Sequence, residues 1–187
     1  MIRLLHRLRG LIKTLTLILL LILASRVILQ NYHIDGQSME PTLHDHEYVL
    51  VNKAAYLFAP PQRGDIIVFQ YPHNPQENYI KRIIAIPGDI ISVEGATVTV
   101  NGVTLQESYV DQNDNFNPFP PLENRIVGPD QYFVMGDNRG NSADSRQWGL
   151  VPRQNIIGKA TVIYWPVNED NFGLLPDASG VFAHVHQ

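Results

Sequence analysis

The sequence contains no cysteine, which excludes disulfides, thiolate metal sites and cysteine catalysis. A strong charge of one sign is missing too, because 14 Lys and Arg residues face 18 Asp and Glu residues, for a formal net charge of −4. So small an imbalance gives no indication of a nucleic-acid partner. Hydrophobic residues make up 44% of the 187 residues, which indicates a globular chain with one compact domain and room for a small subdomain.

Only one long apolar run is present, and it lies near the N-terminus. Residues 1–13 carry four Lys or Arg residues and no acidic one, and residues 14–25 are uninterrupted by charge. A bilayer crossing needs about 20 residues. The segment 11–30 reaches that length if Lys13 and Arg26 extend toward the two membrane interfaces.

These features predict a single transmembrane anchor at 11–30, with the basic residues 1–10 in the cytoplasm and residues 31–187 outside it. A cleaved signal peptide also fits the basic start, although Ala24-Ser25-Arg26 is a poor cleavage site. A buried amphipathic helix is disfavoured because the run is apolar all round.

After residue 31 the sequence consists of short runs of β-forming residues separated by turn residues. Asn101-Gly102 is a strong hairpin signal, and residues 111–124 are expected to form a long loop. We therefore predict a mainly β domain, an antiparallel, barrel-like sheet with a small β extension at about 92–128. Residues 168–187 show no chemistry and are expected to form a partly flexible tail. The expected strands are 48–52, 66–71, 79–86, 90–94, 97–100, 103–105, 131–135 and 158–166.

Three polar stretches are candidates for chemistry. Ser38 lies on a turn at 36–43 punctuated by glycine and proline, and a serine hydroxyl needs a base within hydrogen-bond reach to act as a nucleophile. Lys81 lies among apolar residues, where burial would lower its pKa. The stretch 136–146 is rich in short polar side chains suited to orienting such a pair.

Other polar residues are given structural interpretations. His44 and His46 lack a third metal ligand at a known spacing, as do His184 and His186, so no metal site and no cofactor are predicted. Residues 137–148 fail as a calcium loop, because Trp148 stands where the bidentate glutamate belongs. Arg82 is expected to be a surface charge on the opposite face of its strand from Lys81. Asp137 and Arg146 are expected to form a structural ion pair.

Taken together, the polar stretches resemble a known family in content, order and spacing. The chain is similar to the type I signal peptidases, membrane-bound serine endopeptidases that use a Ser/Lys dyad. The resemblance covers residues 10–166. Its blocks are Gly36-Gln37-Ser38-Met39-Glu40-Pro41-Thr42-Leu43, Arg63-Gly64-Asp65-Ile66-Ile67-Val68-Phe69, Tyr79-Ile80-Lys81-Arg82 with Pro87-Gly88-Asp89, and Gly136-Asp137-Asn138-Arg139 with Asn141-Ser142 and Asp144-Ser145-Arg146.

The resemblance implies a role for each motif residue. Ser38 would be the nucleophile and Lys81 the general base, with Ser142 hydrogen-bonded to the lysine amine and Asp144 supporting the local turn. The oxyanion would be held by the Ser38 N–H. Gly36 occupies the position at which some members have a serine whose hydroxyl is the second donor, so that donor is left open between a backbone group and a water.

The resemblance also implies the substrate, which is the signal peptide of an exported preprotein, cut after a small-x-small motif. Two shallow apolar pockets would receive it as an added strand along the Lys81 strand. For Leu43 and Ile80, ordinary packing in the hydrophobic core is as good an explanation as a place in these pockets.

The expected location is a bacterial-type or thylakoid-type membrane, with the lipid bilayer as a partner and no nucleic acid. The apolar segment 56–60 would contact the bilayer surface or form a buried turn. The pocket residues would be Ile34, Met39, Leu43, Tyr79 and Ile80.

Two rival functions remain at this point. Self-cleaving repressor-type peptidases share the Ser/Lys chemistry, but they would carry a DNA-binding helical domain where this chain has its apolar run. A catalytically inactive, membrane-tethered module that binds signal peptides is the other rival. The presence of Ser38, Lys81 and Ser142 together argues against it.

Overall fold

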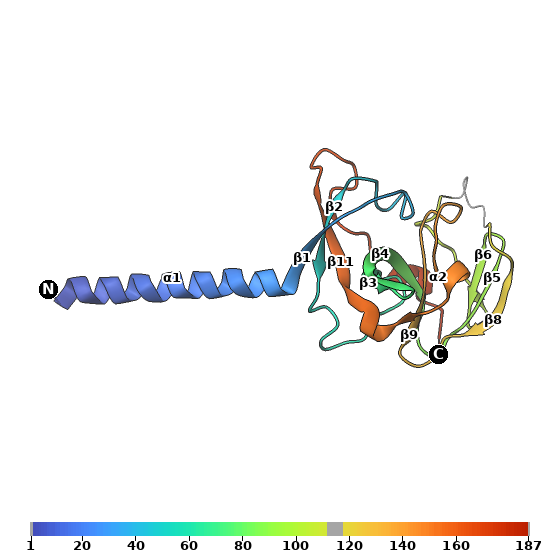
Figure 1. Cartoon of the computed structure of the whole chain (residues 1–187), viewed down its shortest axis with the longest axis horizontal. Coiled ribbons are helices and arrows are strands. Elements are labelled where there is room, and N and C mark those ends of the chain that lie inside the picture. The colour runs from blue at the N-terminus through green and yellow to red at the C-terminus, as the bar shows by residue number, and fades with distance from the viewer. Residues whose placement is uncertain (1, 112–117, 187) are drawn as a thin grey trace.

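The computed structural model describes residues 2–111 and 118–186. Helix α1 (Ile2–Ile28) extends away from a β domain that contains most of the remaining residues (Figure 1). Within α1 the described leucine and isoleucine side chains are exposed, Leu17 by 58% and Leu20 by 57%. Among the described residues, no helix is both long enough and apolar enough to cross a membrane.

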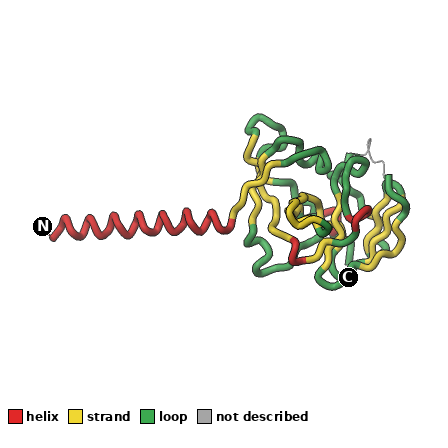
Figure 2. Tube along the Cα trace, viewed as in Figure 1, coloured by secondary structure: helices red, strands yellow, loops and turns green. Residues whose placement is uncertain are grey.

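The main sheet contains eight antiparallel strands. Its order is β1-β2-β11-β3-β4-β9-β10, and β12 pairs with β11. The predicted mainly β, antiparallel fold is confirmed, and Figure 2 shows strands and loops throughout the domain that follows α1. The strands are β1 (Leu29–His33), β2 (Tyr48–Asn52), β3 (Ile66–Tyr71), β4 (Asn74–Ala85), β9 (Gln131–Met135), β10 (Val151–Pro152), β11 (Ile156–Trp165) and β12 (Gly173–Leu174).

A second sheet forms at the end of the molecule opposite α1 (Figure 1). Its order is β7-β6-β5-β8, over the region where an extension is expected. Asn101 and Gly102 have φ values of 51° and 80°, as a tight hairpin between β6 and β7 requires. Of the expected loop at 111–124, residues 112–117 lie outside the described residues, and β8 begins within its last part. The strands are β5 (Ile90–Glu94), β6 (Thr97–Val100), β7 (Val103–Thr104) and β8 (Leu122–Ile126).

Both faces of the main sheet are covered. In β3, Ile66 and Val68 pack into one hydrophobic cluster, whereas Ile67 and Phe69 pack into another on the opposite face. A strand buried on both faces has a continuous apolar sequence rather than an alternating one. This explains the unbroken apolar run at the start of β3.

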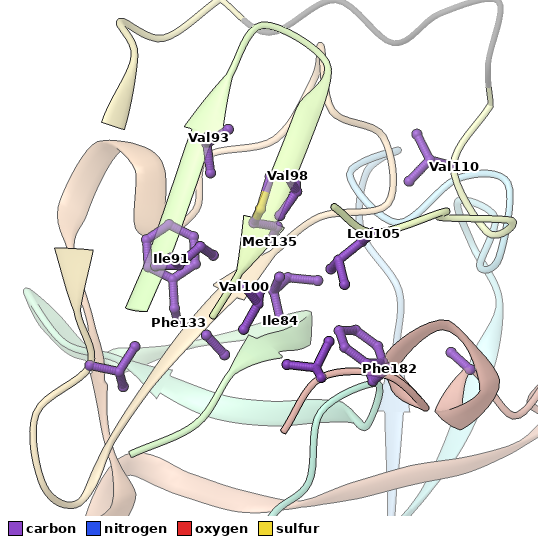
Figure 3. Close-up of a cluster of buried hydrophobic side chains, with 14 of the residues drawn as sticks. Ile84, Ile91, Val93, Val98, Val100, Leu105, Val110, Phe133, Met135 and Phe182 are labelled. Atoms are coloured by element: carbon purple, nitrogen blue, oxygen red, sulfur yellow. The ribbon is translucent and has the colours of Figure 1, made fainter. Parts of the chain in front are cut away.

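A third hydrophobic cluster joins the two sheets to the C-terminal segment (Figure 3). Ile84 and Phe133 come from the main sheet, Ile91 from the second sheet, and Phe182 from the short helix η2 (Ser179–Phe182). The last part of the expected tail at 168–187 therefore packs into the core. Phe182 and Val185 are each only 6% exposed. The Arg63 Nη1 also donates to the carbonyl of Val185 at 3.0 Å.

Candidate active site

Ser38 and Lys81 meet although 43 residues separate them in the sequence. The Lys81 Nζ lies 2.7 Å from the Ser38 Oγ and also donates to the carbonyl of Ile80 at 2.9 Å. Ser38 comes from the turn after β1, and Lys81 from the middle of β4. The predicted pair is thus within hydrogen-bond reach, as a nucleophile and its base must be.

Burial is the main influence on the Lys81 amine. Lys81 is 5% exposed, and desolvation lowers its pKa to about 8, although the charges of Asp144 and Asp137 act in the opposite direction. The positive charge of Arg146 also lowers the pKa of Lys81, but by less than desolvation does. An amine with a pKa of about 8 is partly neutral near physiological pH and can then accept a proton from the serine.

The turn that carries Ser38 is held by the hydrophobic core. Met39 and Leu43 are at most 1% exposed, and the Leu43 N–H donates to the Met39 carbonyl at 2.9 Å. Both side chains belong to the cluster on one face of the main sheet. Neither residue belongs to the lining of the cavity beside Ser38, so their role as pocket residues stays a prediction. Their packing in the core anchors the turn that carries Ser38.

Gly136 brings the serine turn and the 136–146 stretch into direct contact. A Cβ on Gly136 would lie 2.3 Å from both the Ser142 Oγ and the Ser38 carbonyl oxygen. The Ser142 side chain is buried, and its hydroxyl has no hydrogen-bond partner within residues 2–111 and 118–186. The expected bond from Ser142 to Lys81 is not formed in this structure, where Lys81 bonds to Ser38 and Ile80.

Asp144 fixes the local turn, as the motif implies. It precedes helix α2 (Ser145–Trp148), and its carboxylate accepts from the Arg146 N–H at 3.2 Å and from the Gly136 N–H at 3.0 Å. The Arg146 guanidinium pairs with the same carboxylate at 2.7 Å. The expected pair between Asp137 and Arg146 is therefore wrong.

Asp137 pairs instead with Arg82, at 2.6 Å, and both side chains are fully buried. Arg82 also donates to the Gly64 carbonyl at 2.9 Å, and its guanidinium lies 4.0 Å from the centroid of the Tyr109 ring. Its assignment as a surface charge is wrong. The side chain does leave β4 on the face opposite Lys81, but that face is covered by residues distant in the sequence.

A cavity of about 400 Å³ opens beside Ser38 and Lys81. Three of the predicted substrate residues line it, namely Ile34, Tyr79 and Ile80. Sequence reasoning missed the others. Val68 lies opposite Ile80 in the β3–β4 pair, a register that only the structure reveals. The missed lining residues are Tyr32, His33, Asp35, Val68, Glu77, Asn78 and Ala143.

Gly36 lies at the edge of this turn with φ at +97°, a backbone conformation that favours glycine. Its N–H donates to the Asp45 carboxylate at 2.8 Å. The Gly36 N–H is therefore already bonded to a side chain of the same turn region.

Within the part of the chain that the structure describes, two groups of side chains have donor atoms close enough for a metal ion. One contains His33, Asp35 and His46, and the other contains His44, Glu169 and Asp170. Ser38 and Lys81 belong to neither group.

Comparison with known proteins gives consistent results. The family model described as signal peptidase, peptidase S26, matches residues 8–165. A signal peptidase I of Leptolyngbya laminosa is 43% identical over 165 residues, which cover 84% of this chain and 79% of that protein. A signal peptidase I of Bacillus amyloliquefaciens is 36% identical over 162 residues, covering 81% and 84%. A crystal structure of a signal peptidase I from Enterococcus faecalis has 37% identity and a TM-score of 0.46, and the match covers 53% of this chain and 95% of that one.

Proposed function

Because the chain belongs to the signal peptidase family, peptidase S26, we propose that Ser38 is the nucleophile of its reaction and Lys81 the general base. The chain is a serine endopeptidase that removes signal peptides. The assignment of the two residues is supported by one observation above the others. A buried lysine whose pKa is lowered to about 8 lies 2.7 Å from a serine hydroxyl at the edge of a cavity.

The proposed reaction begins with neutral Lys81. Its amine accepts the Ser38 hydroxyl proton as the oxygen attacks the scissile carbonyl carbon. The resulting ammonium gives that proton to the leaving amine when the peptide C–N bond breaks, which leaves an ester on Ser38. Lys81 then takes a proton from water, whose oxygen attacks the ester carbonyl, and returns it to the Ser38 oxygen as the signal peptide leaves.

We assign the supporting roles as follows. The Ser38 N–H donates to the oxyanion, with Gly36 leaving the adjacent space free of a side chain. Asp144 holds the turn that carries Ser142, and Ser142 orients the Lys81 amine by rotation of its free hydroxyl. A hydrogen bond from Ser142 to Lys81, in addition to those that Lys81 makes with Ser38 and Ile80, is sterically reasonable because Ser142 and Ser38 both lie against Gly136.

The proposed substrate path runs along β4. An extended chain presents alternate side chains to the same side, so small residues at alternate positions would face the apolar part of the cavity. Ile34, Tyr79 and Ile80 provide that surface together with Val68. The bulk of these side chains leaves the cavity shallow. A shallow cavity favours substrates with small side chains, such as alanine, at these positions.

Membrane anchoring by α1 is the second part of the proposal. The described leucines and isoleucines of α1 are exposed, and the residues before them are basic. Leu57 and Phe58 are 69% and 98% exposed, so the alternative of a buried turn at 56–60 is wrong. The Lys53 N–H bonds to the Ile28 carbonyl at 2.8 Å, so this apolar loop starts beside the end of α1. We assign the loop to the bilayer surface and residues 31–187 to the extracytoplasmic side of a bacterial-type membrane.

The test of the dyad is cleavage of a purified preprotein by the detergent-solubilised full chain. Lys81→Met keeps the apolar stem and removes the amine, and Ser38→Ala removes the nucleophile. We expect both to lose at least about a hundredfold in rate, the usual contribution of a positioned base. Lys53→Met, which changes an exposed lysine away from the cavity, is the matched control and should cleave normally.

The products and the melting temperatures complete this experiment. Mass spectrometry should place the cut after a small residue, and all variants should melt like the wild type. Cleavage at the normal rate by Lys81→Met would exclude the lysine as the base. A folded wild type that binds the preprotein without cutting it would favour the inactive binding module.

A further inference from the structure

We propose that His33, Asp35 and His46 form a binding site for a divalent transition metal of the zinc class at the rim of the cavity. The potential ligand atoms of the three side chains all lie within 4.8 Å of one another. One pair is closer, since the His33 Nδ1 is 2.9 Å from the Asp35 Oδ1. The His33 and His46 rings are stacked with their centroids 5.7 Å apart.

The backbone holds these side chains together without a metal. His33 ends β1 and Asp35 follows two residues later, while His46 lies on the turn before β2. Ile34, between the first two, donates its N–H to the Glu47 carbonyl at 2.8 Å and accepts from the His46 N–H at 2.9 Å. The two segments are thus joined on both sides of the cluster.

The ligand types suit zinc. Two imidazole nitrogens and one carboxylate oxygen, with water in the fourth position, form a common tetrahedral set whose ligand atoms lie about 3.3 Å apart. The side chains of Asp35 and His46 are 84% and 78% exposed, so an ion reaches them from solvent. The contact between His33 and Asp35 is exposed, so little stability is lost when a metal ion replaces it.

The position of the site gives it a consequence for the peptidase. His33, Ile34 and Asp35 line the same cavity as Ser38, whereas His46 lies outside that lining. An ion held by both segments would narrow the rim along which an extended chain enters. Zinc binding should therefore slow cleavage. This consequence depends on the proposed function, but the metal site itself does not.

Direct binding is measured first, by calorimetric titration of ZnCl₂ into the full chain in detergent at pH 7.5, where imidazoles are available as ligands. Co²⁺ provides a second readout, because tetrahedral Co²⁺ with nitrogen ligands has a distinctive visible absorption. His46→Asn is the informative variant. His46 has φ at +68°, and asparagine tolerates this backbone conformation better than alanine does.

We expect wild type to bind one equivalent of Zn²⁺ that His46→Asn loses or binds at least about tenfold more weakly. His184→Ala, which changes an exposed histidine outside the cluster, should keep that equivalent. Equal affinity in wild type and His46→Asn would overturn the site, as would the absence of binding to the wild type.

The activity of the same proteins tests the consequence. Zn²⁺ should inhibit cleavage by wild type and by His184→Ala, but not by His46→Asn, whose activity without zinc should be normal. Equal inhibition of all three would overturn the role at the rim. If the wild type cuts no preprotein, the proposed function fails, and the calorimetry still decides the metal site.

Discussion

Ser142 has a buried hydroxyl without a partner within the described residues, close to the dyad. Removal of an unsatisfied hydroxyl should cost little stability, whereas loss of a catalytic contact to Lys81 should slow the reaction. We predict that Ser142→Ala lowers kcat about tenfold or more, equivalent to one hydrogen bond of about 1.4 kcal/mol. Single-turnover cleavage and thermal unfolding measure the two effects. An unchanged kcat would show that Ser142 only fills space.

Gly136 has no room for a side chain. An added Cβ would lie 2.3 Å from the Ser38 carbonyl oxygen, a backbone atom that cannot easily move. We predict that Gly136→Ala destabilises the fold by about 1–3 kcal/mol, as overpacking does, and abolishes cleavage. Gly180→Ala is the control, because a Cβ there meets nothing within 4 Å. Wild-type cleavage by Gly136→Ala would contradict the close packing of the serine turn.

The pairing of Ser38 with Lys81 could be predicted from the sequence, but the surroundings of Arg82 could not. Ser38 and Lys81 each lie in a short motif that is recognisable from neighbouring residues in the sequence. The exposure of Arg82 depends on Asp137 and Tyr109, which reach it only after the chain has folded. Met39 and Leu43 illustrate the same limit, since their motif does not reveal which side of the turn faces the core.

At the scale of elements, the C-terminal segment closes the core between the two sheets. Phe182 is 6% exposed and packs with Ile84, Ile91 and Phe133 (Figure 3). We predict that Phe182→Ala lowers the free energy of unfolding by about 3–5 kcal/mol, the usual cost of removing a buried phenylalanine. Phe172 is 48% exposed, so Phe172→Ala should cost much less in the same denaturant titration. Similar values for both variants would contradict a packed tail.

Strands with apolar runs could be predicted, and those that depend on distant partners could not. The runs at 48–52, 66–71 and 131–135 coincide with β2, β3 and β9. The first part of β4, residues 74–78, is polar and gave no signal, because its pairing with the end of β3 leaves most of it exposed. The tail was missed since its apolar residues are few and acquire partners only from other elements.

At the scale of the whole molecule, the proposed anchor places the peptidase at the membrane where its substrates emerge. We predict that the full chain remains with the membrane fraction after an alkaline wash. A variant with Leu19→Lys and Leu20→Lys should be released, because each charge at the centre of a membrane helix costs about 2.5–3.5 kcal/mol. Release of the wild type by the same wash would contradict the anchor.

The pH dependence of cleavage tests the central claim most directly. Lys81 accepts a proton only when neutral, and burial lowers its pKa to about 8. The neutral fraction therefore rises as the pH rises through 8. We predict that kcat/KM of the wild type increases about tenfold per pH unit below pH 8 and levels off above it. The lysine would be excluded as the base by a kcat/KM that stays constant from well below pH 8 to well above it.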